Sequence, residues 1–182
     1  FEQAVQRMSG GVRTGDRAAV LDTAPGIIQS TAAAERRLAE AGAPAADIAQ
    51  VRSFRNGLQS TFFENSAAQV MSAPAVAEAF GSRTDQQRFE QAVQRMSGGV
   101  RTGDRAAVLD SAPGIIQATA TAERRLAETG APTADIAQVR SFGDQLRATV
   151  MQKGAARLMD TPAVAEAFGA PTERQRFVEA SR

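Results

Sequence analysis

The sequence predicts an all-α protein built from two copies of one helical unit. Residues 1–54 realign onto residues 89–142 without a gap and with only five differences, each exchanging one small residue for another. Apolar residues recur at the three- and four-residue spacing of helices, and no segment shows the alternating pattern of a strand. Aromatic residues make up 5% of the chain, which favours slim helical bundles. We therefore expect tandem repeats of about five helices each.

The repeat sets the predicted domain organisation. One unit covers residues 1–88 and the second covers residues 89–176, while residues 177–182 begin a third unit or a capping helix. The chain starts without an initiator Met, so we expect it to be a piece of a longer protein. Only residues 82–84 separate the helices of the two units, and so short a linker predicts rigid joining into an elongated array. Two independent beads are the alternative.

The first helix is easiest to predict at the junction between the copies. Residues 84–87 read Thr-Asp-Gln-Gln, which is the pattern of a capping box. The glycine pairs at 10–11 and 98–99 are expected to end this helix in each copy. One helical face is expected to carry Phe89, Val93 and Met96.

Two further helices are predicted on either side of Pro25. A short helix begins at Thr14, and Pro25 with Gly26 interrupts it. The next helix carries Pro25 in its first turn and ends at Gly42. Its apolar positions recur with a period near 3.6 residues, at Ile27, Ile28, Thr31, Ala34 and Leu38.

The fourth and fifth helices complete the unit. Pro44 and Asp47 open the fourth and longest helix, whose apolar stripe comprises Ile48, Val51, Phe54, Leu58 and Phe62. The fifth is short and spans residues 74–81, matched at 162–169, where Thr161 caps it and Pro162 takes the first position.

The copies diverge most over residues 55–73, where Phe62 and Phe63 become Val150 and Met151. Adjacent residues of a helix cannot both face one core stripe. One of the pair is therefore expected either to point outward toward lipid or a partner, or to pack against the fifth helix or a neighbouring unit. The packing interpretation is favoured.

The composition argues against several classes of function. The chain has no His, Cys, Tyr or Trp, so the usual acids, bases and nucleophiles are scarce and we expect no enzyme, metal or cofactor. Acidic residues such as Asp16, Asp22, Glu35 and Glu40 sit where solvated helix faces or first turns normally carry them. A net charge of +1 disfavours nucleic acid. No apolar run is long enough to span a membrane.

The repeated segment Gly-Gly-Val-Arg-Thr-Gly-Asp-Arg, at 10–17 and 98–105, suggests an anion site. A glycine-rich turn that leads into a helix N-terminus exposes backbone N–H groups, and arginine adds forked donors. Alternatively, the glycines only end one helix and Thr14 caps the next, and the arginine bias reflects a GC-rich genome. The predicted site residues are Arg13, Thr14, Gly15, Arg17, Arg36 and Arg37, with Arg101, Thr102, Gly103, Arg105, Arg124 and Arg125.

The pair Arg36 and Arg37 joins this prediction on the condition that it converges with Arg13 and Arg17 across the fold. Convergence would give each unit a compact basic patch. The alternative is an ordinary solvated helix face, on which Glu35 and Glu40 pair locally with the two arginines.

The repeated segments GGVRTGDRAAVLD, at 10–22 and 98–110, and ADIAQVRSF, at 46–54 and 134–142, resemble the tandem-repeat regions of type III secreted effectors from plant-associated bacteria. Rhizobial effectors that join such repeats to a ubiquitin-like protease domain are the most similar. The resemblance implies secretion from the bacterial cytoplasm into a host cell, with any protease in another part of the protein.

Two functions follow as expectations. The first is a non-catalytic module that binds an anionic ligand, such as a phosphoinositide-containing host membrane or a phosphorylated partner, through the repeated arginines. Linked weak sites would gain strongly from avidity. The alternative is a protein-binding scaffold or a spacer between domains of a larger effector.

Overall fold

The computed structural model describes residues 1–159. All regular structure in this range is helical, which confirms the predicted all-α class. Short turns join the helices, and α4 is far shorter than the others. The helices are α1 (Glu2–Thr14), α2 (Arg17–Glu40), α3 (Ala45–Val70), α4 (Pro74–Ala79), α5 (Arg83–Thr102), α6 (Arg105–Glu128) and α7 (Thr133–Met159).

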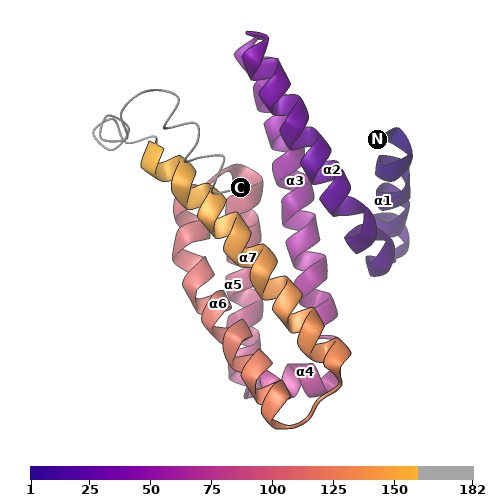
Figure 1. Cartoon of the computed structure of the whole chain (residues 1–182), viewed down its shortest axis with the longest axis vertical. Helices are drawn as coiled ribbons and strands as arrows, with labels where there is room; N and C mark the ends of the chain where they lie inside the picture. Colours follow the sequence, from indigo (N-terminus) through magenta and orange to yellow (C-terminus); the bar gives the residue numbers. More distant parts are fainter. Residues whose placement is uncertain (160–182) are drawn as a thin grey trace.

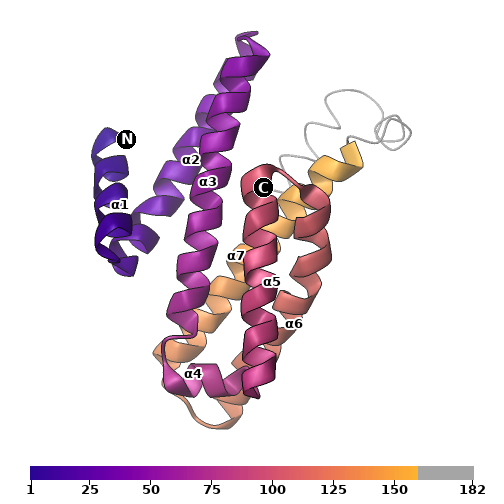
Figure 2. The same cartoon turned by 180° about the vertical axis from the view of Figure 1, so that it is seen from behind.

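The helix α3 stands between the two copies. It packs against α2 on one side and against α5 on the other, as Figures 1 and 2 show from opposite directions. In the second copy α6 packs between α5 and α7, and α4 lies against α6 at the lower end in Figure 1. The long helix of the first copy is therefore also a structural part of the second.

Two hydrophobic cores flank α3. The smaller core comprises Met8, Val20, Ala24, Ile27, Leu58 and Phe62. The larger core combines the second half of α3 and α4 with α5, α6 and α7. Phe62 lies in the smaller core and Phe63 in the larger one, with exposed fractions of 8% and 2%. Both side chains are buried, which confirms that this pair packs inside the protein.

The predicted break at Pro25 is wrong, because α2 runs through this residue without interruption. Proline inside a helix costs about 3 kcal/mol. Ala24 and Ile27, on either side of it, are buried in the smaller core while Pro25 itself is exposed, so packing of the flanking residues offsets the cost. The predicted second and third helices are one helix. The first unit consequently contains four helices, not five, before α5 begins at Arg83.

The predicted end of the first helix is also wrong. Gly10 and Gly11 lie inside α1, which continues to Thr14 and ends at Gly15 with a φ of 72°. Gly11 is needed for close packing, because an added Cβ would lie 2.9 Å from the backbone oxygen of Asp16 and 3.0 Å from the Cβ of Ala19. Gly11 therefore lets α1 and α2 approach each other closely, whereas an added Cβ at Gly10 would meet nothing within 4 Å.

The capping box at the start of α5 lies two residues before the predicted one. Ser82, not Thr84, is the N-cap, and its hydroxyl accepts a hydrogen bond from the backbone N–H of Asp85. The carboxylate of Asp85 in turn accepts from the backbone N–H of Ser82. The separation between the helices is still three residues, now Phe80 to Ser82.

The short helix α4 agrees with the prediction. Pro74 occupies its first position, Val76 and Phe80 are buried, and Gly81 follows with a φ of 108°. The matching helix predicted at residues 161–169 lies outside the described residues. In α3 the predicted stripe is buried at Leu58 and Phe62 but not at its middle, because Phe54 is 44% exposed.

Candidate functional site

The turn between α1 and α2 carries its own anion. The Asp16 carboxylate accepts a hydrogen bond from the backbone N–H of Ala19 at 3.0 Å, and Asp104 accepts from Ala107 at 3.1 Å in the second copy. Each carboxylate caps the following helix at the place where an external anion would bind. Thr14 does not cap α2, because its hydroxyl donates to the carbonyl of Gly10 at the end of α1. The anion prediction therefore depends on the arginines.

The predicted arginines do not converge within a unit. Arg17 is the first residue of α2, and Arg36 and Arg37 lie near its other end. At a rise of about 1.5 Å per residue, Arg36 lies about 28 Å along the helix axis from Arg17. The same spacing separates Arg105 from Arg124 in α6. The condition for a compact basic patch is thus not met within a unit, and each unit carries two separate pairs of arginines.

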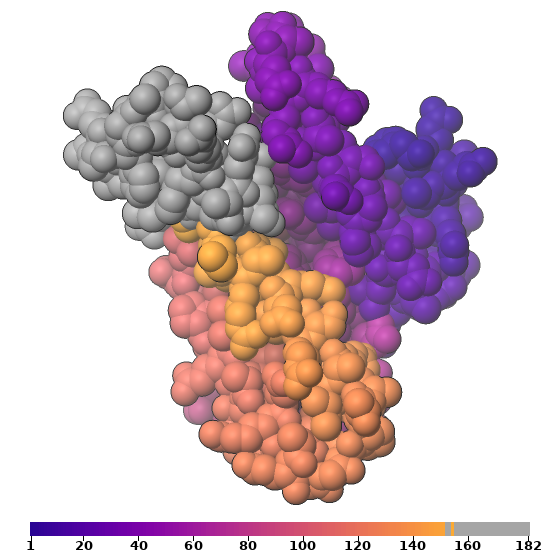
Figure 3. Space-filling model, viewed as in Figure 1, coloured from indigo at the N-terminus to yellow at the C-terminus, as the bar shows by residue number. Residues whose placement is uncertain are grey.

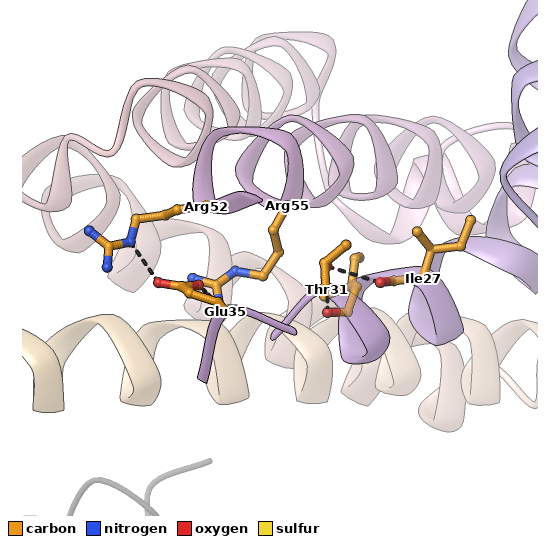
Figure 4. Close-up of polar contacts among 6 residues, drawn as sticks. Ile27, Thr31, Glu35, Arg52 and Arg55 are labelled. Atoms are coloured by element: carbon orange, nitrogen blue, oxygen red, sulfur yellow. Dashed lines mark hydrogen bonds and ion pairs between the residues drawn. The ribbon is translucent and has the colours of Figure 1, made fainter. Parts of the chain in front are cut away.

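Glu35 pairs across to α3 instead of pairing locally with Arg36 or Arg37. Its carboxylate contacts Nε of Arg52 at 2.7 Å and Nη1 of Arg55 at 2.6 Å (Figure 4). The side chains of Glu35 and Arg55 are only 13% and 15% exposed, so this cluster joins α2 to α3 in a partly desolvated position. The expected solvated pairing is therefore wrong for Glu35.

The second copy keeps only half of this cluster. Arg140 contacts Glu123 at 2.7 Å, as Arg52 contacts Glu35, but Gly143 stands at the position of Arg55. An added Cβ at Gly143 would lie 3.1 Å from Cγ2 of Thr119. The long helices of the second copy are therefore in close contact where an ion pair joins those of the first. Sequence reasoning missed the cluster, although the change from Arg55 to Gly143 between nearly identical copies was its visible signal.

The four predicted site arginines of the first unit are exposed and have no ion-pair partner among the described residues. They are Arg13, Arg17, Arg36 and Arg37. Thr14 and Gly15 beside them are exposed as well. The structure therefore leaves their charge available at the surface, at both ends of α2.

Several of the matching residues in the second copy form hydrogen bonds or ion pairs. Arg125 donates through Nη1 to the carbonyl of Ala79 at 3.0 Å, which fastens the end of α4 to α6. Arg124 lies 3.9 Å from Glu128 in an exposed pair, Arg105 is half-buried, and Thr102 is exposed with its hydroxyl bonded to Gly98. Gly103 has φ 76°. The duplicated residues thus have different surroundings in the two copies.

A cavity of about 490 Å³ opens between α3 and α5. The residues that line it include the charged residues Glu64, Glu90 and Arg101. Arg101 is the one predicted site residue on this surface. Two carboxylates against one guanidinium disfavour an anionic ligand here. The remaining lining residues are Ala67, Ala68, Met71, Val93 and Gln94.

Across residues 1–159, no group of three or more metal-binding side chains is close enough together to hold an ion. Likewise, none of the described helices is both long and apolar enough to cross a membrane. Comparison with protein-family models, with curated proteins and with solved structures finds no significant match to the chain. A proposed function must therefore be argued from the packing and charges of this chain itself.

Proposed function

We propose that the chain is a stacking repeat scaffold, which holds whatever is attached to its two ends at a fixed separation. One observation carries the proposal, namely that α3 belongs to two cores at once. Phe62 and Phe63 are neighbours in sequence, and their rings lie 6.1 Å apart edge to face, yet they are buried in different cores. A helix shared in this way couples the position of one unit to that of the next.

The contacts around α4 support rigid joining. Only Phe80 to Ser82 separate α4 from α5, and the capping box of Ser82 and Asp85 orders this short link. Arg125 holds the other side of α4 through its bond to Ala79. Independent beads would each bury their own apolar residues, whereas the larger core contains residues from both sides of position 88.

Distance measurements between spin labels test the scaffold. The chain contains no cysteine, so Gln29→Cys and Gln117→Cys place labels at equivalent exposed positions of α2 and α6. We expect one narrow distance distribution. Adding Phe63→Ala should broaden it, whereas Gln50→Ala, at an exposed position of the same helix, should not. A broad distribution in the chain without either substitution in α3 contradicts the proposal.

Binding of an anionic ligand is the second proposal, and the unpaired exposed arginines of α1 and α2 favour it. Two linked copies of a weak site bind with avidity, and anionic lipid attracts each nearby basic residue by roughly 1 kcal/mol. In co-sedimentation with phosphoinositide-containing liposomes, Arg13→Ala with Arg17→Ala should reduce the bound fraction. If the variant and the unchanged chain bind equally, these arginines are not part of the site. If the chain binds liposomes of no lipid composition, the proposal is wrong.

The resemblance to bacterial effector repeats suggests where such a scaffold acts. In a secreted effector it would hold further domains apart inside the host cell. This is a proposal that rests on the resemblance alone, whereas the stacking rests on the two cores.

A further inference from the structure

The large apolar side chains that remain exposed are not scattered at random. Among the described residues these are Phe1, Val12, Phe54 and Met151, with exposed fractions of 65%, 51%, 44% and 61%. Each has a counterpart 88 positions away that is almost completely buried. The counterparts are Phe89 at 3%, Val100 at 0%, Phe142 at 2% and Phe63 at 2%.

These counterparts all belong to the larger core, in which α3 and α4 pack against α5. Phe89 of α5 stacks against Phe80, with ring centroids 4.4 Å apart, and lies 6.0 Å from Phe142. Val100 and Phe63 belong to the same core. The end of α3 together with α4 therefore covers one face of α5.

The same face exists on α1 but has no such cover. Residues 1–14 and 89–102 are identical in sequence, and α1 lies at the edge of the molecule, in indigo in Figure 3. Phe1 and Val12 are exposed there, whereas Phe89 and Val100 are buried in the larger core. The difference between the copies is thus in their surroundings and not in their residues.

Equivalent polar residues also have different surroundings in the two copies. Arg125 donates to the carbonyl of Ala79 at the end of α4, whereas its counterpart Arg37 is exposed without an ion-pair partner in the described chain. Ser97 is completely buried, whereas Ser9 is exposed. The first unit therefore also exposes, near the end of α2, the arginine whose counterpart bonds α4 in the second unit.

The sequence that covers α5 is repeated at the other end of the chain. Met151 in α7 stands at the position of Phe63 and is exposed. Residues 162–168 read Pro-Ala-Val-Ala-Glu-Ala-Phe, identical to residues 74–80. One chain thus carries both an uncovered face and a second copy of the sequence that covers such a face.

We propose that the uncovered face of α1, together with Phe54, binds the carboxyl-terminal part of α7 and the following residues of a second copy of this chain. The inference rests on the proposed stacking, since it repeats between two chains the contact that joins the units within one. The two surfaces differ, so the contact does not close on itself, and head-to-tail addition continues as an open array.

The mass of the 182-residue chain in solution, measured by analytical ultracentrifugation, tests this proposal. The weight-average mass should rise with concentration beyond twice the 19.1 kDa of one chain. Val12→Asp blocks one surface and Met151→Asp the other, so each variant alone should remain a single chain. An equimolar mixture should reach two chains and stop, because each variant keeps one intact surface.

A matched control separates docking from charge. Gln3→Asp adds the same charge to α1, at a position whose counterpart Gln91 stays exposed in the second copy, and should assemble like the unchanged chain. Val12 and Met151 are exposed, so both variants should keep the helical circular dichroism of the parent.

Three results overturn the proposal. These are a single chain at every concentration up to the millimolar range, assembly that stops at a symmetric pair, or assembly that Met151→Asp leaves unchanged. The spin-label distances between Gln29 and Gln117 report separately on stacking within the chain. A narrow distance distribution without assembly contradicts only the docking proposal. A broad distance distribution contradicts the proposed scaffold, on which the docking rests.

Discussion

At the scale of single residues, the duplication places equivalent serines, Ser97 and Ser9, in two different environments. The Ser97 hydroxyl is completely buried and has no hydrogen-bond partner among the described residues, while Ser9 is exposed. Leaving a buried polar group unpaired costs about 1–3 kcal/mol. Ser97→Ala should therefore raise the free energy of unfolding by about 1 kcal/mol, measured by urea denaturation. Ser9→Ala should leave it unchanged, and a loss of stability in Ser97→Ala would contradict the unpaired state.

Two adjacent glycines of α5 should respond to alanine with opposite signs. An added Cβ at Gly98 meets nothing within 4 Å, whereas at Gly99 it would lie 2.9 Å from both the Cβ of Ala107 and the backbone oxygen of Asp104. Gly98→Ala should stabilise the protein by up to about 1 kcal/mol through helix propensity. Gly99→Ala should destabilise it by about 1–3 kcal/mol through overpacking. Thermal unfolding of both variants measures the two changes in stability. Equal shifts of the unfolding temperature would show that α5 and α6 are not in close contact.

At the scale of elements, the shared helix α3 makes a directional prediction. Replacing a buried phenylalanine by alanine costs about 3–5 kcal/mol. Phe62→Ala should loosen the smaller core and speed amide exchange in α1 and α2. Phe63→Ala should instead loosen the larger core and speed amide exchange in α5. NMR-detected hydrogen exchange on both variants distinguishes the two sides, and faster exchange on the same side in both would contradict the separation of the cores.

The start of α5 should make stability depend on acid. Hydrogen bonds from Ser82, helped by Arg88 and Arg125, hold the pKa of Asp85 below its ordinary range. A carboxylate with a lowered pKa in the folded state stabilises the protein above its unfolded pKa of about 3.9 and loses this effect as pH falls through the folded pKa. Asp85→Asn should therefore be less stable than the parent at neutral pH, with the difference vanishing in acid. Denaturation at a series of pH values tests this, and a difference independent of pH would indicate packing instead of charge.

The sequence predicted which segments are helical better than where the helices end. The starts of α3 and α4 were predicted correctly, because Pro44 and Pro74 act locally on the chain. The ends at Gly11 and Pro25 were wrong, because tertiary contacts decide them. Gly11 is required where α1 meets α2, and the buried neighbours of Pro25 hold α2 together across it. Local signals cannot report contacts between segments that are distant in sequence.

At the scale of the whole molecule, the two identical helix sequences should differ in dynamics. Residues 1–14 and 89–102 have the same intrinsic exchange chemistry, but α5 packs against both α3 and α6, whereas α1 packs chiefly against α2. Amides of α1 should therefore exchange faster than the matching amides of α5. NMR resolves the two copies, and equal protection would contradict the larger core as the more stable part.

The candidate site was harder to predict than the fold. Sequence identified the exposed arginines, yet not their spacing, because the merging of two predicted helices into α2 set Arg17 and Arg36 far apart. Nor did it show that Arg37 and Arg125, which are the same residue in two nearly identical helices, have different surroundings. Only the position of each copy in the stack distinguishes them.

The identity of α1 and α5 has a consequence for how the chain folds. Before any core forms, both sequences offer the same apolar face to the Phe63 side of α3, so they compete for it. Connectivity favours α5, because only residues 71–82 link it to α3, and closing a short loop costs less entropy than closing one that spans all of α2. We expect a chain in which α1 docks there first to be trapped until that contact opens again, because α3 then no longer covers the apolar face of α5. The loop length around α4 therefore selects between two otherwise equal partners.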